Sequence, residues 1–239
     1  MKISGLISAV AIATGMATLA VVASPLTASA ATFNFSNIAN SDNTGGDSIV
    51  GQLKLDVTDA SAGKTLWKFS NTATATSNSA SFISQIYFDW ANSSLALTSP
   101  SFNIGNIGSV KYKSGANPNN LPQGNNIGFV ADLAITNDKQ GSGKDGIDLS
   151  ESLGVIFNSP TASVIAAAIN GGTFRVGYRV QGIAVNNGNS DAYVSCTSST
   201  CGTTPPPAKP VPVPGFLLGL MAAGALGGTR LLKNKKQVS

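Results

Sequence analysis

The sequence predicts a mainly β protein, an antiparallel β-sandwich of jelly-roll-like form with one short covering helix, an N-terminal signal peptide and a C-terminal transmembrane helix. Short β-rich segments recur between residues 49 and 185, separated by clusters of Asn, Gly, Pro and Ser, which predicts the sheet. An apolar segment near each end of the 239-residue chain predicts the terminal elements. We divide the chain into a signal peptide (1–30), the β-sandwich domain (31–203), a proline-rich linker (204–214) and a tail (215–236).

The N-terminal segment has the features of a secretory signal peptide. Lys2 precedes an uncharged stretch over residues 3–23, and small residues follow at Ala28, Ala30 and Ala31. Because signal peptidases cut after an A-x-A sequence, we expect cleavage after Ala30. An uncleaved membrane anchor is the weaker alternative, since the A-x-A site stands at the expected distance from the apolar run.

The first predicted strand shows the alternation of a half-buried strand. Over residues 49–57, Leu53, Leu55 and Val57 share one face, while Gln52, Lys54 and Asp56 share the other. Further strands are predicted over residues 65–71, 82–90, 95–104, 127–135, 152–158 and 173–185. Gly115–Asn126, which reads GANPNNLPQGNN, is predicted as a turn cluster between two of them.

One helix interrupts the strands. Ser159 and Pro160 predict its start, and Asn170-Gly171-Gly172 predicts a left-handed stop. Its expected apolar face consists of Val164, Ile165, Ala168 and Ile169, and would cover an open end of the sandwich between the strands near residues 155 and 174. The aromatic residues of the strands are predicted as core or strand-edge residues, namely Phe69, Phe82, Tyr87, Phe88, Trp90, Phe129, Phe157 and Phe174.

Charge and residue type exclude several classes of function. Six of the 15 basic residues lie in the terminal segments, so the middle of the chain carries nine basic and 11 acidic residues and no basic cluster, and we exclude nucleic-acid binding. Cys196 and Cys201 are predicted to close a small disulfide loop, as is typical of exported chains. The chain has no histidine, so triads that need one and His-ligated metals are excluded.

The C-terminal segment combines three signals. The linker ends in Pro212-Val213-Pro214 and favours an extended geometry. The uncharged run GFLLGLMAAGALGG follows, and then the basic residues Arg230, Lys233, Lys235 and Lys236, which favour a cytoplasmic tip. Fourteen to eighteen apolar residues form a short span, which the long basic side chains can extend to the membrane surface.

This ending resembles the tails of PEP-CTERM proteins, bacterial exports that exosortases recognise and process. The chain departs from the commonest pattern, because Val213 stands where the family's glutamate usually lies and RLLKNKK replaces a tight arginine run. The middle is also similar to one group of cyanobacterial PEP-CTERM surface proteins, through GDSIVGQLKLDV and SVIAAAINGGTFRVGYRVQGI among other segments. The resemblance implies an exosortase-dependent surface or exopolysaccharide-associated protein that meets the inner membrane at least transiently.

We therefore predict a non-enzymatic exported protein of the cell envelope or extracellular matrix, with no cofactor and no metal. The alternative is a carbohydrate-binding module that contacts exopolysaccharide through Trp90 and Asn-rich loops. An enzyme that uses acids alone would depend on Glu151, the single glutamate, with Asp145 and Asp148 nearby. Asp138, Asp145, Asp148 and Glu151 also offer oxygen ligands for calcium, but they lack the spacing of an EF-hand, so a solvated turn is the favoured interpretation.

Overall fold

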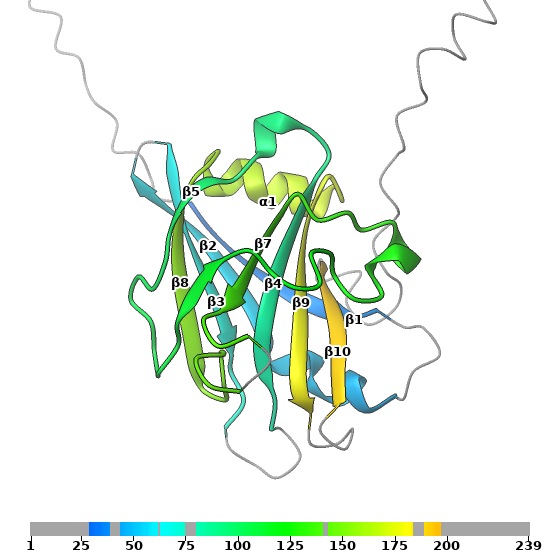
Figure 1. Cartoon of the computed structure of the whole chain (residues 1–239). Coiled ribbons are helices and arrows are strands. Elements are labelled where there is room, and N and C mark those ends of the chain that lie inside the picture. The colour runs from blue at the N-terminus through cyan, green and yellow to red at the C-terminus, as the bar shows by residue number, and fades with distance from the viewer. Residues whose placement is uncertain are drawn as a thin grey trace, which may run out of the picture.

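The computed structural model describes residues 29–38, 44–61, 63–74, 80–140, 143–183 and 189–196. These residues form one antiparallel sheet of ten strands, nearly closed on itself, with a single α-helix among them (Figure 1). The strand order is β5-β8-β3-β2-β1-β10-β9-β4-β7-β6. The prediction of a mainly β, antiparallel protein with one helix is thus confirmed for the described residues.

The strands have the following bounds: β1 Ala30–Asn37, β2 Leu53–Ser61, β3 Lys64–Asn71, β4 Phe82–Trp90, β5 Thr98–Ser101, β6 Tyr112–Ser114, β7 Leu133–Asn137, β8 Glu151–Asn158, β9 Phe174–Ile183 and β10 Asn189–Cys196. The 3₁₀ helices are η1 Thr44–Gln52, η2 Ser93–Leu95 and η3 Gly124–Ile127, and the α-helix is α1 Ala162–Asn170. The first predicted strand begins four residues later than expected, because residues 49–52 belong to η1. Strands β1, β6 and β10 were not predicted.

Strand β1 joins the two halves of the sheet. Its first residues, Ala30 to Phe33, pair with β2, whereas Asn34 to Asn37 pair with β10. In Figure 1 this strand, drawn in blue, crosses obliquely behind the others. The two halves face each other across the core, because rings from β3 and β8 contact rings from β4 and β9.

The core is rich in aromatic residues. The ring of Trp67 on β3 lies 5.7 Å from Phe88 on β4 and 5.6 Å from Phe174 on β9, measured between centroids. Phe69 contacts Phe88 at 6.0 Å, and Tyr178 stacks on Phe35 at 3.8 Å. All five of these core rings on β3, β4 and β9 have no exposed surface. Edge-to-face and offset contacts of this kind add to the burial of apolar area.

A second, smaller core lies on the outer face of the half that contains β4 and β9. Residues 115–131, which we call the strap, cross this face and place Leu121, Ile127 and Phe129 over Tyr87 and Val194. The strap is held by hydrogen bonds from Gln85 Nε2 to Asn117 O (2.9 Å) and from the Tyr87 hydroxyl to Pro118 O (3.0 Å). The turn cluster predicted here is therefore a packed cover, which explains why β4 is buried on both faces.

Helix α1 closes one end of the sheet, as Figure 1 shows. Its buried residues are Ala162, Ile165, Ala168 and Ile169. Val164, which we placed on the apolar face, is 47% exposed, so that prediction was wrong: Ala162 occupies the inward position instead. The N-cap residue is Thr161, whose side chain forms no capping bond; the backbone N–H of Ala162 donates to Asp59 of β2 at 2.7 Å.

Candidate functional site

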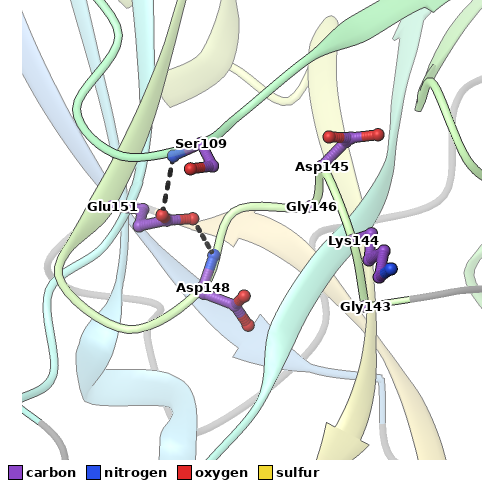
Figure 2. A pocket seen from close by; sticks show the side chains of 7 residues that line it. All are labelled: Ser109, Gly143, Lys144, Asp145, Gly146, Asp148 and Glu151. Carbon is purple, nitrogen blue, oxygen red and sulfur yellow. Dashed lines mark hydrogen bonds between the residues drawn. The ribbon is translucent and has the colours of Figure 1, made fainter.

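The candidate site is an open pocket of about 680 Å³ beside the start of β8. It gathers three of the four acids that the sequence offered as calcium ligands or as a catalytic pair. Its lining residues are Ser109, Gly143, Lys144, Asp145, Gly146, Asp148 and Glu151, shown in Figure 2. Ser109 and Lys144 were not predicted, because they come from loops whose folding places them here without any local motif.

Glu151 connects two loops through hydrogen bonds to their backbones. Its Oε1 accepts a hydrogen bond from the backbone N–H of Ser109 at 2.9 Å, and its Oε2 accepts one from Asp148 N at 3.0 Å (Figure 2). Gly108 lies so close that a Cβ atom there would stand 2.0 Å from Oε1. Both carboxylate oxygens are thus occupied by the backbone, which favours a structural role for this residue.

The other acids do not converge on a common point. Asp138 pairs with Lys113 at 3.1 Å, and Asp145 lies 4.0 Å from the Lys139 ammonium. Figure 2 shows the carboxylates of Asp145 and Asp148 pointing in different directions. Within the described ranges, no three Asp, Glu or Cys residues form a group that could hold a metal ion.

The surroundings of Asp148 disfavour the charged form of its side chain. Partial desolvation, followed by the nearby negative charge of Glu151, raises the pKa of Asp148 above its ordinary value of 3.8. In the part of the chain that the structure describes, its carboxylate accepts no hydrogen bond and joins no ion pair. It is therefore the acid of this pocket that remains available to a ligand.

Trp90, the predicted glycan contact, ends β4 at the surface of the main core. Its ring stacks on Phe174 at a centroid distance of 6.0 Å and an interplanar angle of 29°. The backbone N–H of Trp90 donates to Asp132 Oδ2 at 2.8 Å, which connects β4 to the residue that follows the strap. The side chain is half-buried, because one face of the ring packs against the main core.

The remaining predicted residues are divided between described and undescribed parts of the chain. Ala30 and Ala31 begin β1, and Cys196 ends β10 with 3% of its surface exposed. Ala28, Cys201 and the sorting residues Pro212, Val213, Pro214, Arg230, Lys233, Lys235 and Lys236 lie outside the described residues. No helix of the described part is long and apolar enough to cross a membrane, and the predicted span lies outside that part.

Sequence reasoning missed a buried ion pair in the second core. Arg175 on β9 donates through Nε to Asp89 Oδ2 on β4 at 2.9 Å, and Nη1 donates to Ile127 O of the strap at 2.7 Å. The guanidinium carbon lies 5.2 Å from the centroid of the Phe129 ring. Two opposite charges on strands that are distant in sequence give no local signal of pairing, so the pair becomes visible only when β4 and β9 are aligned.

Comparison with known proteins returned no family model, no curated protein and no solved structure that matches this chain.

Proposed function

We propose that the chain is a non-enzymatic exported protein of the cell surface or exopolysaccharide matrix, sorted by an exosortase through its C-terminal tail. The terminal segments of the sequence support export, with the tail held transiently in the inner membrane before the protein reaches the envelope or matrix. A jelly-roll-like sandwich as the exported domain belongs to the same proposal. It is supported by the ring contacts between the two halves of the sheet.

The proposal that the protein is not an enzyme rests on one observation, namely that its acidic side chains are engaged in contacts within the fold. A glycosidase needs two carboxylates free to act on a sugar. Here each acid other than Asp148 that has a described side chain forms an ion pair or accepts a hydrogen bond within the fold: Asp56, Asp59, Asp89, Asp132, Asp138, Asp145, Glu151 and Asp191. Such a distribution favours acids that stabilise the domain over acids that act on a substrate.

The sorting proposal is tested by the intact mass of the protein recovered from envelope and medium. We compare the producing strain with a strain that lacks its exosortase. We expect loss of the residues after about Pro214 only when the exosortase is present. The same unprocessed C-terminus in both strains would instead make the tail a permanent anchor.

A carbohydrate-binding module is the second candidate, favoured by the construction of the strap. Hydrogen bonds to Gln85 and Tyr87 fix its backbone, while Asn119, Asn125 and Asn126 remain exposed. Pre-organised amides suit neutral sugar hydroxyls because little conformational freedom is lost on binding.

The carbohydrate candidate is tested by retention on polysaccharide columns. We compare the wild-type domain with Trp90→Leu and with a control, Val130→Ala, which changes a 63% exposed side chain of the strap. Loss of retention in Trp90→Leu but not in Val130→Ala supports the carbohydrate-binding module. If the wild-type domain is retained on no glycan, this candidate is rejected.

A further inference from the structure

The predicted cleavage site lies inside a strand once the domain has folded. Asp59 N donates to Ser29 O at 3.1 Å, and Ser29 N donates to Asp59 Oδ2 at 3.1 Å. Ala30 stands opposite Thr58, and Ala31 opposite Val57, in the antiparallel ladder with β2. The peptide bond between Ala30 and Ala31 is therefore flanked by ladder residues on both sides.

The residues that follow this bond hold the strand in place. The Thr32 hydroxyl donates to Asp56 Oδ1, and Phe33 and Phe35 are 4% and 2% exposed in the main core. From Asn34 onward the strand pairs with β10 instead of β2. The segment after the bond thus connects both halves of the sheet, and its release would expose core aromatics to water.

Hydrolysis of this bond requires an opened strand. A peptidase binds the backbone on both sides of the bond, and water then adds across the amide, leaving a carboxylate on Ala30 and an ammonium group on Ala31. In the folded chain these backbone groups belong to the ladder with β2. When opening and closing are fast, the rate of proteolysis follows the small population of opened molecules.

We propose that removal of the signal peptide must precede the docking of β1, so that a precursor which folds first becomes resistant to signal peptidase. This inference rests on the proposed function, because it assumes that residues 1–30 are a cleaved signal peptide. Cleavage removes the hydrogen bonds between Ser29 and Asp59. The bond that the backbone N–H of Ala162 donates to Asp59 Oδ1 at 2.7 Å remains. The mature domain therefore keeps the contact that caps α1.

The test uses the full chain in detergent micelles with a bacterial signal peptidase. One sample is diluted from denaturant directly into the enzyme, and the other is refolded first, as judged by circular dichroism. We expect the refolded precursor to be cleaved at least about tenfold more slowly than the other sample, because only the opened strand is cleaved. Product masses identify Ala31 as the new N-terminus.

A matched control separates the inference from the proposed function. In this variant about twelve glycine and serine residues stand between Ala31 and Thr32, so that the site lies on a flexible tether outside the strand. We expect it to be cleaved at the same rate in both samples. Equal cleavage of the two wild-type samples would overturn the inference alone, whereas no cleavage of any sample, the tethered variant included, would refute the signal peptide itself.

Discussion

At the scale of single residues, the buried pair of Asp89 and Arg175 shows how charge is used in this fold. Asp89 is fully buried and Arg175 is 1% exposed, so both have lost their hydration. The guanidinium also donates to Ile127 O and Gly128 O, and therefore joins strands β4 and β9 to the strap. Breaking one partner of such a pair leaves the other charge buried and uncompensated.

Asp89→Ala is expected to lower the free energy of unfolding by about 3–5 kcal/mol, because the buried charge of Arg175 would lose its opposite charge. The double change Asp89→Ala with Arg175→Met is expected to lower it by less than the sum of the two single changes. Urea denaturation of the four proteins of this cycle measures the coupling. Additive losses would show that the two residues contribute independently.

Asp148 provides a pH-dependent prediction with the opposite sign to that of a salt-bridged acid. Its pKa is raised by desolvation and by Glu151, so folding favours the protonated form, and the carboxylate lowers stability above the folded pKa. Asp148→Asn is expected to raise the free energy of unfolding slightly at neutral pH, because water around this exposed residue screens most of the effect. The gain should vanish below the ordinary pKa of 3.8, and thermal unfolding across this range checks it.

At the scale of elements, the strap depends on close approach to β9. A Cβ atom at Gly177 would stand 2.6 Å from Leu121 Cδ2 and 3.0 Å from its Cδ1. Gly177→Ala is therefore expected to lower the free energy of unfolding by about 1–3 kcal/mol, as overpacking does. Leu121→Ala in the same chain removes the clashing atoms.

The Leu121→Ala background supplies the control for this contact. In this background, Gly177→Ala should lower the free energy of unfolding by much less than it does in the wild type. Chemical denaturation of the single and double variants measures the difference. An equal cost in both backgrounds would show that Leu121 is not the residue that meets the new methyl group.

Alternating apolar residues and the turn residues between them predicted the strands that carry such a local pattern. They did not predict the strands that form through pairing with distant segments. The pattern at Leu53, Leu55 and Val57 marks β2, and FISQIYFDW matches β4 residue for residue. Strand β1 was missed because its pairing switches from β2 to β10 at Asn34, which no local pattern encodes. The exposure of Val164 was missed for a similar reason, since the rotation of α1 is set by its contacts with β1, β2, β9 and β10.

The pocket shows the same limit. Sequence spacing correctly suggested that Asp145, Asp148 and Glu151 lie close together, because a short loop connects them. It could not show that Glu151 binds the backbone of Ser109, 42 residues away, or that Asp138 faces Lys113 instead. Nearness along the chain was predictable, whereas the direction of each side chain depended on segments that fold against the loop.

At the scale of the whole molecule, strand β10 ends beside the middle of β1 and helix α1. Cys196, the last residue of β10, stands opposite Asn34 of β1, and both line a cavity of about 290 Å³ with Ala166 and Asn170 of the helix.

Three buried tyrosines make the stability of the whole domain sensitive to alkali. The hydroxyls of Tyr112, Tyr178 and Tyr87 donate to the carbonyls of Ile83, Lys54 and Pro118, so they connect β6, β9 and β4 to other segments. Burial is the main cause that raises the pKa of each phenol above the ordinary 10.0. Folding therefore favours the neutral phenol, and stability must fall as the pH rises through that ordinary value.

The expected outcome is that these tyrosines ionise only when the sheet unfolds. Tyrosinate absorbance measured against pH should rise in one cooperative step that coincides with the loss of the circular dichroism signal, instead of a gradual titration near pH 10. Tyr112→Phe removes one phenol and its bond to Ile83 O, so it should reduce the amplitude of the step. If absorbance rose while the circular dichroism signal was retained, the phenols would be reaching water in the folded state, and the three hydroxyl bonds would not act as one unit with the sheet.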